Sequence, residues 1–178
     1  MRRVILIFGL LAGALISVFV IVMIGLWEKN GIALHSELVG YASMVIALSM
    51  VFFGIKSYRD NYQKGAIKFW KGVQIGFLIT IIASLMYAIT WETYNRVNPA
   101  GYASFINGYC ESYIGKVKAK GASASEVEQA VKSIQDMKKQ LENPVIRFGM
   151  TLLEIMPVGI IITLISAAVL RKKELLPA

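Results

Sequence analysis

One acidic side chain interrupts the last long apolar stretch of the chain, and it is the strongest candidate for chemistry. Glu154 lies within residues 148–170, which hold no other charged side chain. If this stretch spans a membrane, an ionised carboxylate near its middle costs roughly 2.5–3.5 kcal/mol, so the group should face a bundle interior, a cavity or a partner. Two roles stay open for Glu154: a proton-linked or cation-binding group, and a structural hydrogen bond that joins two helices.

Other polar residues at a similar depth complete this candidate intramembrane polar site. Thr80, Ser84 and Tyr87 are spaced by four and three residues, so they share one face of a helix. Arg147 precedes Glu154 by seven residues, on roughly the same helix face, and could reach toward it. The hydroxyls could also serve helix packing alone, which weakens them as a signal for a site.

Helix-breaking and small residues mark the same stretches. Pro157 follows Glu154 closely and removes one helix hydrogen bond, which predicts a kink that serves either as a hinge or as static packing. Gly9 and Gly13 are four residues apart, as are Gly72 and Gly76. Such spacing lets helix backbones approach closely. It predicts packing within the monomer, with homodimerisation as the alternative.

Several kinds of site lack the residues they need. Cys110 is the one cysteine and His35 the one histidine, so a disulfide within the chain and a Cys/His metal cluster are both excluded. The sequence holds no phosphate-binding loop, nucleophile elbow or paired carboxylates. We therefore expect no metal, no cofactor and no enzymatic activity.

The elements that must position these residues are membrane spans. The chain is 56% hydrophobic with a mean hydropathy of +0.59, which is too apolar for a soluble domain of 178 residues. A span needs roughly 20 apolar residues, and it must be a helix because lipid offers no partner for backbone polar groups. The sequence predicts spans over residues 4–26, 38–55, 72–91 and 148–170. No cleavage-site pattern follows the first, so we expect it to be retained.

The positive charges predict the orientation. A net charge of +8 would suggest nucleic acid in a soluble protein. Here the basic residues cluster in three short segments that alternate spans place on one side: Arg2, Arg3, Lys56, Arg59, Lys64, Lys68, Lys71, Arg171, Lys172 and Lys173. Because short cytoplasmic loops carry excess lysine and arginine, we expect both termini in the cytoplasm and no nucleic-acid partner.

The segment between the third and fourth spans predicts an extracytoplasmic two-helix hairpin over residues 99–143. Its first helix should begin at Pro99 and end at Gly121. The second should begin at Ser125, with Glu128 completing a capping box. We expect their apolar stripes to pack together or lie on the membrane, and the alternative is that the aromatic face of the first helix binds a partner or lipid.

Three stretches then resemble a known family. They are FFGIKSYRDN (residues 52–61), KGASASEVE (residues 120–128) and TLLEIMPVGIIITLISAAVLRKK (residues 151–173). Together with the order of elements, they resemble the bacterial domain of unknown function 4199 family. The third is the most specific, because an acid and a proline rarely occur together inside a span. The resemblance implies an uncharacterised four-helix protein of the bacterial cytoplasmic (inner) membrane, and it implies no catalytic residues.

The sequence as a whole predicts an all-α integral membrane protein with four transmembrane helices and an outer hairpin, forming a single membrane domain over residues 1–178. We expect a structural, accessory or interaction protein that acts through helix packing and its hairpin, in contact with membrane lipids. A homo-oligomer and a membrane-protein partner both stay open. The alternative is a small transporter or channel subunit that uses Glu154.

Overall fold

The computed structural model describes residues 1–30 and 37–172, and it is all-α. Its helices are α1 (Arg2–Asn30), α2 (Glu37–Tyr62), α3 (Phe69–Val97), α4 (Pro99–Ala119), α5 (Ala124–Leu141) and α6 (Pro144–Leu170). Four of them, α1, α2, α3 and α6, are long and apolar enough to cross a membrane. The expected all-α class is confirmed, with four candidate membrane spans. His35 and Lys173 lie outside the described residues.

The helices extend beyond the predicted apolar stretches. α2 continues to Tyr62 and α3 to Val97, so the connection between α2 and α3 covers only residues 63–68. An apolar run marks the hydrocarbon-facing part of a helix, whereas backbone hydrogen bonds continue into the polar boundary. Within this loop, Ile67 donates its amide to Lys172 O at 3.1 Å and accepts one from Lys172 at 3.2 Å. The loop is thereby tied to the end of α6.

An Asn-Pro pair stands at each junction between the bundle and the hairpin. Asn98 precedes Pro99 at the start of α4, and its side chain accepts a hydrogen bond from the amide of Gly101 at 2.9 Å. Asn143 precedes Pro144 at the start of α6 and caps that helix in the same way. Proline disfavours helical backbone at the preceding residue and lacks the amide that the first helical position does not need. Each pair therefore begins a new helix in a new direction.

The start of α5 corrects the sequence prediction. The N-cap is Ser123, whose amide donates to Glu126 Oε2 at 2.7 Å while its hydroxyl accepts from the Glu126 amide at 3.3 Å. The capping box predicted at Ser125 is wrong. Both serines precede a glutamate at the same spacing, and the earlier start adds two hydrogen-bonded residues to the helix for the same cap.

The half of the bundle that holds the N-terminus and the end of α6 is tightly packed. Side chains with almost no exposed surface meet there from three helices: Leu48, Val51, Ile55, Ile75, Ile79 and Thr163. Thr80 and Thr163 join α3 to α6 through hydroxyls 3.4 Å apart. This half of the bundle is therefore closed by side chains.

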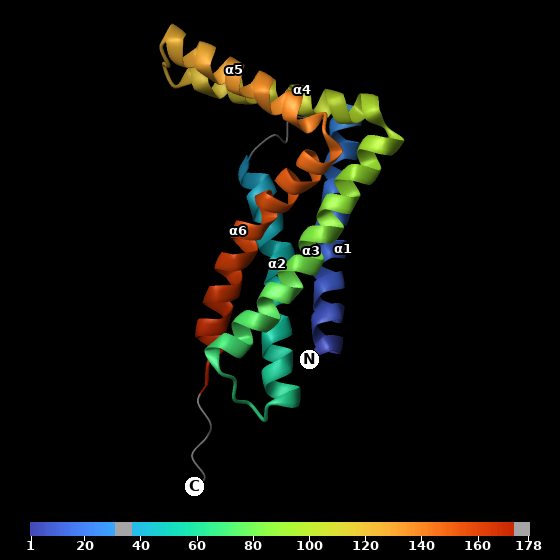
Figure 1. The fold of residues 1–178 in the computed structure, drawn as a ribbon, viewed down its shortest axis with the longest axis vertical. Helices are drawn as coiled ribbons and strands as arrows, with labels where there is room; N and C mark the ends of the chain where they lie inside the picture. The colour runs from blue at the N-terminus through green and yellow to red at the C-terminus, as the bar shows by residue number, and fades with distance from the viewer. Residues whose placement is uncertain (31–36, 173–178) are drawn as a thin grey trace.

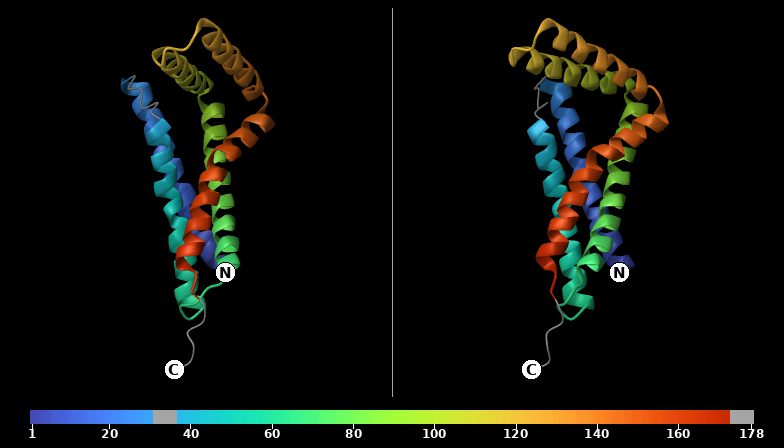
Figure 2. Two further views of the ribbon diagram at one scale, coloured as in Figure 1. Left: turned by 90° about the vertical axis from the view of Figure 1, so that its left-hand side faces the viewer. Right: turned by 60° about the vertical axis from the view of Figure 1, so that its left-hand side comes forward.

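Figure 1 shows the hairpin α4–α5 lying across the opposite end of the bundle, at a steep angle to the spans. The two views of Figure 2 show α1 and α2 leaning away from α3 and α6 toward that end. In agreement with this divergence, α1 packs on α2 and α3, and α6 packs on α2 and α3, with no contact between α1 and α6 in the described residues. The bundle is thus closed at one end and splayed at the other.

Candidate functional site

A pocket of about 430 Å³ occupies the splayed end of the bundle, beneath the hairpin. All six helices contribute to its lining, which includes Ile24 of α1, Tyr41 of α2 and Met137 of α5. Its surface is largely apolar, and it is partly open. Ligand sites in proteins are typically concave and mostly apolar, with volumes of about 300–1,000 Å³ and few polar groups. The size and lining of this pocket fit that description.

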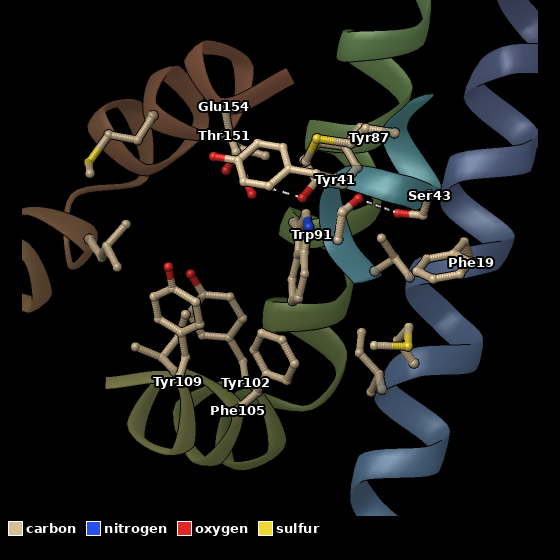
Figure 3. A pocket seen from close by; sticks show the side chains of 18 of the residues that line it. Phe19, Tyr41, Ser43, Tyr87, Trp91, Tyr102, Phe105, Tyr109, Thr151 and Glu154 are labelled. Carbon is tan, nitrogen blue, oxygen red and sulfur yellow. Dashed lines mark hydrogen bonds between the residues drawn. The ribbon is translucent and has the colours of Figure 1, made fainter. Parts of the chain in front are cut away.

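Glu154 of α6 and Tyr87 of α3 meet at this pocket. The hydroxyl of Tyr87 donates a hydrogen bond to Glu154 Oε2 at 3.3 Å. Tyr87 is buried, whereas Glu154 keeps an exposed side chain and lines the pocket together with Thr151. Figure 3 shows the two side chains pointing toward each other from their separate helices. The carboxylate therefore faces a cavity as well as a helix partner.

Aromatic rings form one wall of the pocket. The ring of Trp91 on α3 lies 5.2 Å from that of Phe105 and 6.1 Å from that of Tyr102, measured between centroids. Figure 3 shows Tyr102, Phe105 and Tyr109 extending from α4 toward the space near Glu154. Burial raises the pKa of Tyr102, which keeps its hydroxyl protonated at neutral pH. The aromatic stripe of the hairpin thus faces the bundle and contributes to the pocket.

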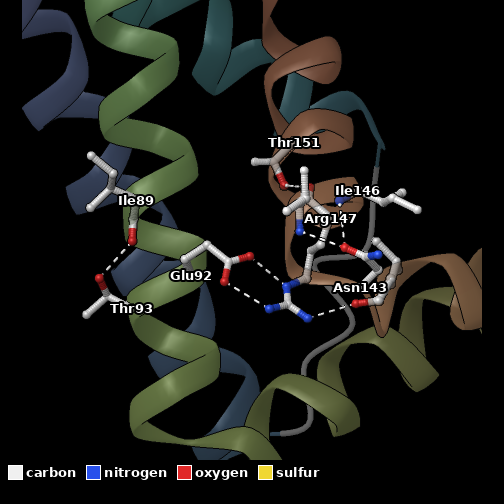
Figure 4. A network of polar contacts seen from close by, with 9 residues as sticks. Ile89, Glu92, Thr93, Asn143, Ile146, Arg147 and Thr151 are labelled. Carbon is white, nitrogen blue, oxygen red and sulfur yellow. Dashed lines mark hydrogen bonds and ion pairs between the residues drawn. The ribbon is translucent and has the colours of Figure 1, made fainter.

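Arg147 does not reach Glu154. Its guanidinium donates to Glu92 Oε1 at 2.6 Å and to Glu92 Oε2 at 2.9 Å, and also to the carbonyl of Leu141 at 2.7 Å. Figure 4 shows this network between α3, the end of α5 and the first turn of α6. A two-point arginine–carboxylate pair has a strict geometry. It fixes the hairpin relative to both spans and leaves Glu154 without this cation.

Two other residues of the predicted polar site, Thr80 and Ser84, make their contacts away from Glu154. Thr80 contacts Thr163, and Ser84 donates to the carbonyl of Thr80 at 2.8 Å. Both side chains are buried in the closed part of the bundle. Of the three residues on that helix face, only Tyr87 reaches the carboxylate.

The sequence of the chain also matches a known protein family. Residues 7–172 match the model of a family described as a protein of unknown function, DUF4199. The chain belongs to the DUF4199 family. The matched range contains Tyr87, Trp91, Arg147 and Glu154, and the resemblance seen in the sequence is confirmed. Neither a curated protein nor a solved structure matches the chain.

Pro157 lies inside α6, three residues beyond Glu154. Because proline has no amide hydrogen, the carbonyl of Leu153 loses its usual helical partner. Figure 1 shows α6 changing direction along its length. The proline stands at the level where α6 passes from the closed half of the bundle to the pocket.

The paired glycines lie against neighbouring helices of the same chain. A Cβ atom at Gly9 would be 2.8 Å from Ile82, and Gly13 lies against Met86, both on α3. A Cβ atom at Gly72 would be 3.1 Å from Ala167, and one at Gly76 would be 2.7 Å from Thr163, both on α6. These four positions therefore serve contacts within the monomer.

The predicted site residues did not include Glu92, Thr163 or most of the residues that line the pocket, such as Trp91. Glu92 lies just past the predicted end of the third span, and its distance of 55 residues from Arg147 hides their pairing. Thr163 and Trp91 looked like ordinary span residues. The sequence could have indicated the Glu92–Arg147 pair, because an acid and a base near the same boundary of two spans are expected at the same depth in the membrane. In the described residues, no group of three acids, cysteines or histidines could hold a metal.

Proposed function

We propose that this member of the DUF4199 family is a non-enzymatic integral membrane protein that binds an apolar or amphipathic ligand in its outer pocket. The observation that carries the proposal is the pocket itself, to which the four spans and the hairpin all contribute. A cavity lined by six separate helices forms only when the whole chain is folded. Binding there would couple the hairpin to the spans, which is the behaviour of an interaction or accessory protein.

The proposal includes an orientation in the bacterial cytoplasmic membrane. Figure 1 places the N-terminus and the α2–α3 loop at one end of the bundle and the hairpin at the other. The basic residues Arg3, Arg59, Lys64 and Lys172 belong to the end opposite the hairpin. Because lysine and arginine concentrate on the cytoplasmic side, both termini would be cytoplasmic and the hairpin outside.

A pocket-filling variant tests the binding proposal. Gly40 lines the pocket, and a Cβ atom added there would meet nothing within 4 Å. Gly149 is equally open but does not line the pocket, so Gly149→Leu is a matched control for Gly40→Leu. Native mass spectrometry of the purified full-length protein should show co-purified lipid or another apolar ligand. We expect Gly40→Leu to lose that ligand and Gly149→Leu to keep it; equal retention in both variants contradicts the proposal.

The orientation has its own experiment. Cys110 is buried, and burial raises the pKa of its thiol, so the unmodified chain should label poorly with maleimide. In whole cells, a membrane-impermeant maleimide should label Lys120→Cys, at the tip of the hairpin, without permeabilisation. Gln63→Cys, in the α2–α3 loop, should label only after permeabilisation. The reverse pattern would show the opposite orientation.

A transporter or channel subunit is the second candidate, and the position of Glu154 in the pocket favours it. Intramembrane acids often mark ion or substrate pathways. Against it, the other half of the bundle is closed by side chains such as Val51, Ile79 and Thr163, which have at most 2% exposed surface. Proteoliposomes distinguish the two: the binding proposal predicts ligand uptake by the protein without flux. A flux lost in Glu154→Gln supports transport.

Whether a second copy or another membrane protein joins the complex is measurable by the same mass spectrometry.

A further inference from the structure

The pocket holds one carboxyl group, and no lysine or arginine of the described chain is among the residues that line it. Among the described residues that line it, Glu154 is the only aspartate, glutamate, lysine, arginine or histidine, and its Oε2 accepts a hydrogen bond from Tyr87. Arg147 is engaged by Glu92 and by a backbone carbonyl, and it does not line the pocket. The second carboxylate oxygen, Oε1, is therefore available to a ligand.

The residues around this carboxylate favour a ligand that carries an organic ammonium group. Lining residues include Tyr41, Tyr87, Trp91, Tyr102 and Phe105, so rings gather from α2, α3 and α4. The faces of aromatic rings attract cations, with tryptophan the strongest, by about 0.5–2 kcal/mol each. Tyr102 already makes such a contact, because the guanidinium carbon of Arg147 lies 5.9 Å from its ring centroid.

The rest of the lining suits an apolar body. Val20, Ile24, Met44, Ile106 and Met137 form apolar parts of the walls. The hydroxyls of Ser43 and Thr151 also line the pocket, and each donates to a backbone carbonyl of its own helix. A small inorganic cation would find one carboxylate and otherwise only side-chain hydroxyls, whereas such cations are usually held by several carboxylate and carbonyl oxygens. An anion would be repelled by Glu154, and a neutral molecule would gain nothing from its charge.

We propose that the pocket binds an organic ammonium ion with an apolar body, held by the Glu154 carboxylate and the surrounding aromatic rings. This inference rests on the proposed binding function and names the chemical class of the ligand. Glu154 acts as the counter-ion, while Tyr87 orients its carboxylate from α3. The pocket rings surround the ammonium group, and the apolar walls receive the remainder of the molecule.

Three probes of one shape and different charge test the inference. They are (4-hydroxyphenyl)trimethylammonium, the neutral 4-tert-butylphenol and the anionic 4-hydroxybenzenesulfonate. Calorimetric titration uses the full-length protein in phosphatidylglycerol nanodiscs, with empty nanodiscs as the blank. We expect the cation to bind about tenfold or more tightly than the neutral probe, because a carboxylate contact and ring contacts together exceed about 1.4 kcal/mol. The anion should show no binding.

Two variants that each remove one negative charge test whether the preference for the cation depends on Glu154. Glu154→Gln keeps the shape and the acceptor for Tyr87 but removes the charge, so the preference for the cation should fall to about twofold or less. Its affinity for 4-tert-butylphenol should stay unchanged, which also shows that the pocket is folded. Glu111→Gln removes an acid on the exposed surface of α4, outside the pocket, and should leave the preference intact.

The outcomes separate this inference from the proposed function. Equal affinity for the cation and the neutral probe overturns the ammonium inference and leaves the pocket as a binding site. Binding of none of the probes overturns both. Nanodiscs that contain phosphatidylethanolamine identify the source of the ammonium group: competition with the cationic probe assigns it to a lipid headgroup, and its absence assigns it to a free amphiphile.

Discussion

The guanidinium of Arg147 on α6 donates hydrogen bonds to both carboxylate oxygens of Glu92 on α3, at 2.6 and 2.9 Å. The two residues are 55 positions apart in the chain. Both side chains are well covered, with exposed fractions of 11% for Arg147 and 16% for Glu92. The pair stands at the level where α3 and α6 leave the bundle for the hairpin. It therefore sets the distance between the two spans that carry Tyr87 and Glu154.

Removing the arginine should destabilise the protein. In Arg147→Gln, Glu92 stays covered and keeps only the weaker influence of the Arg96 charge, and breaking such a pair costs about 2–4 kcal/mol when it is slightly exposed. Lys132→Gln is the matched control, because Lys132 is exposed on α5. Thermal unfolding of the purified protein in detergent measures the difference. An equal shift in the two variants would show that the pair contributes little.

The glycine contacts predict opposite effects of alanine at two positions. A Cβ atom at Gly76 would approach Thr163 to 2.7 Å and Val51 to 3.0 Å, so Gly76→Ala should cost about 1–3 kcal/mol. Gly149 has open space, and alanine there should stabilise the helix by up to about 1 kcal/mol. Unfolding midpoints that move in the same direction would contradict the packing seen here.

The two serines at the start of α5, Ser123 and Ser125, should differ in their contribution to helix stability. Ser123→Ala removes the observed N-cap and should cost about 1 kcal/mol of local helix stability. Ser125→Ala lies inside the first turn and should be close to neutral. Hydrogen–deuterium exchange of the amides at the start of α5 measures both, and faster exchange confined to Ser125→Ala would restore the capping box predicted from the sequence.

The same cap should depend on pH. Hydrogen bonds from the amide and hydroxyl of Ser123 lower the pKa of Glu126 below its ordinary value of 4.5. A lowered carboxyl pKa means that the stabilisation is present above pH 4.5 and is lost as the pH falls through the folded-state pKa. Protection of the first turn of α5 should therefore decrease in acid. Glu126→Gln should remove this dependence, and Glu128→Gln should retain it.

Replacing Glu154 by leucine distinguishes its two roles. The leucine loses the hydrogen bond from Tyr87, worth about 0.6–1 kcal/mol in membranes, and removes the cost of an acid at this depth. We expect Glu154→Leu to assemble with an unfolding midpoint near that of the unmodified protein and to lose the preference for the cationic probe. A large loss of stability would show that the carboxylate serves mainly to join α3 and α6.

The sequence alone was sufficient for the parts of the fold that depend on local chemistry. Residues 148–170 and the other apolar stretches predicted the spans, because backbone groups in lipid must bond within a helix. Pro99 and Gly121 predicted the limits of α4 through their restricted and permissive backbones. Glu154 stood out because a charge inside a span is costly.

Tertiary structure decided which of these residues meet. Arg147 was placed near Glu154 by helical spacing, but it pairs with Glu92, because a bidentate contact with a facing carboxylate is stronger than a reach of seven residues along its own helix. The contact of the α4 rings with Trp91 also depends on packing between helices that are distant in the sequence. Sequence therefore determined the helices and the costly acid, whereas the pocket around that acid arises from long-range contacts that no local pattern encodes.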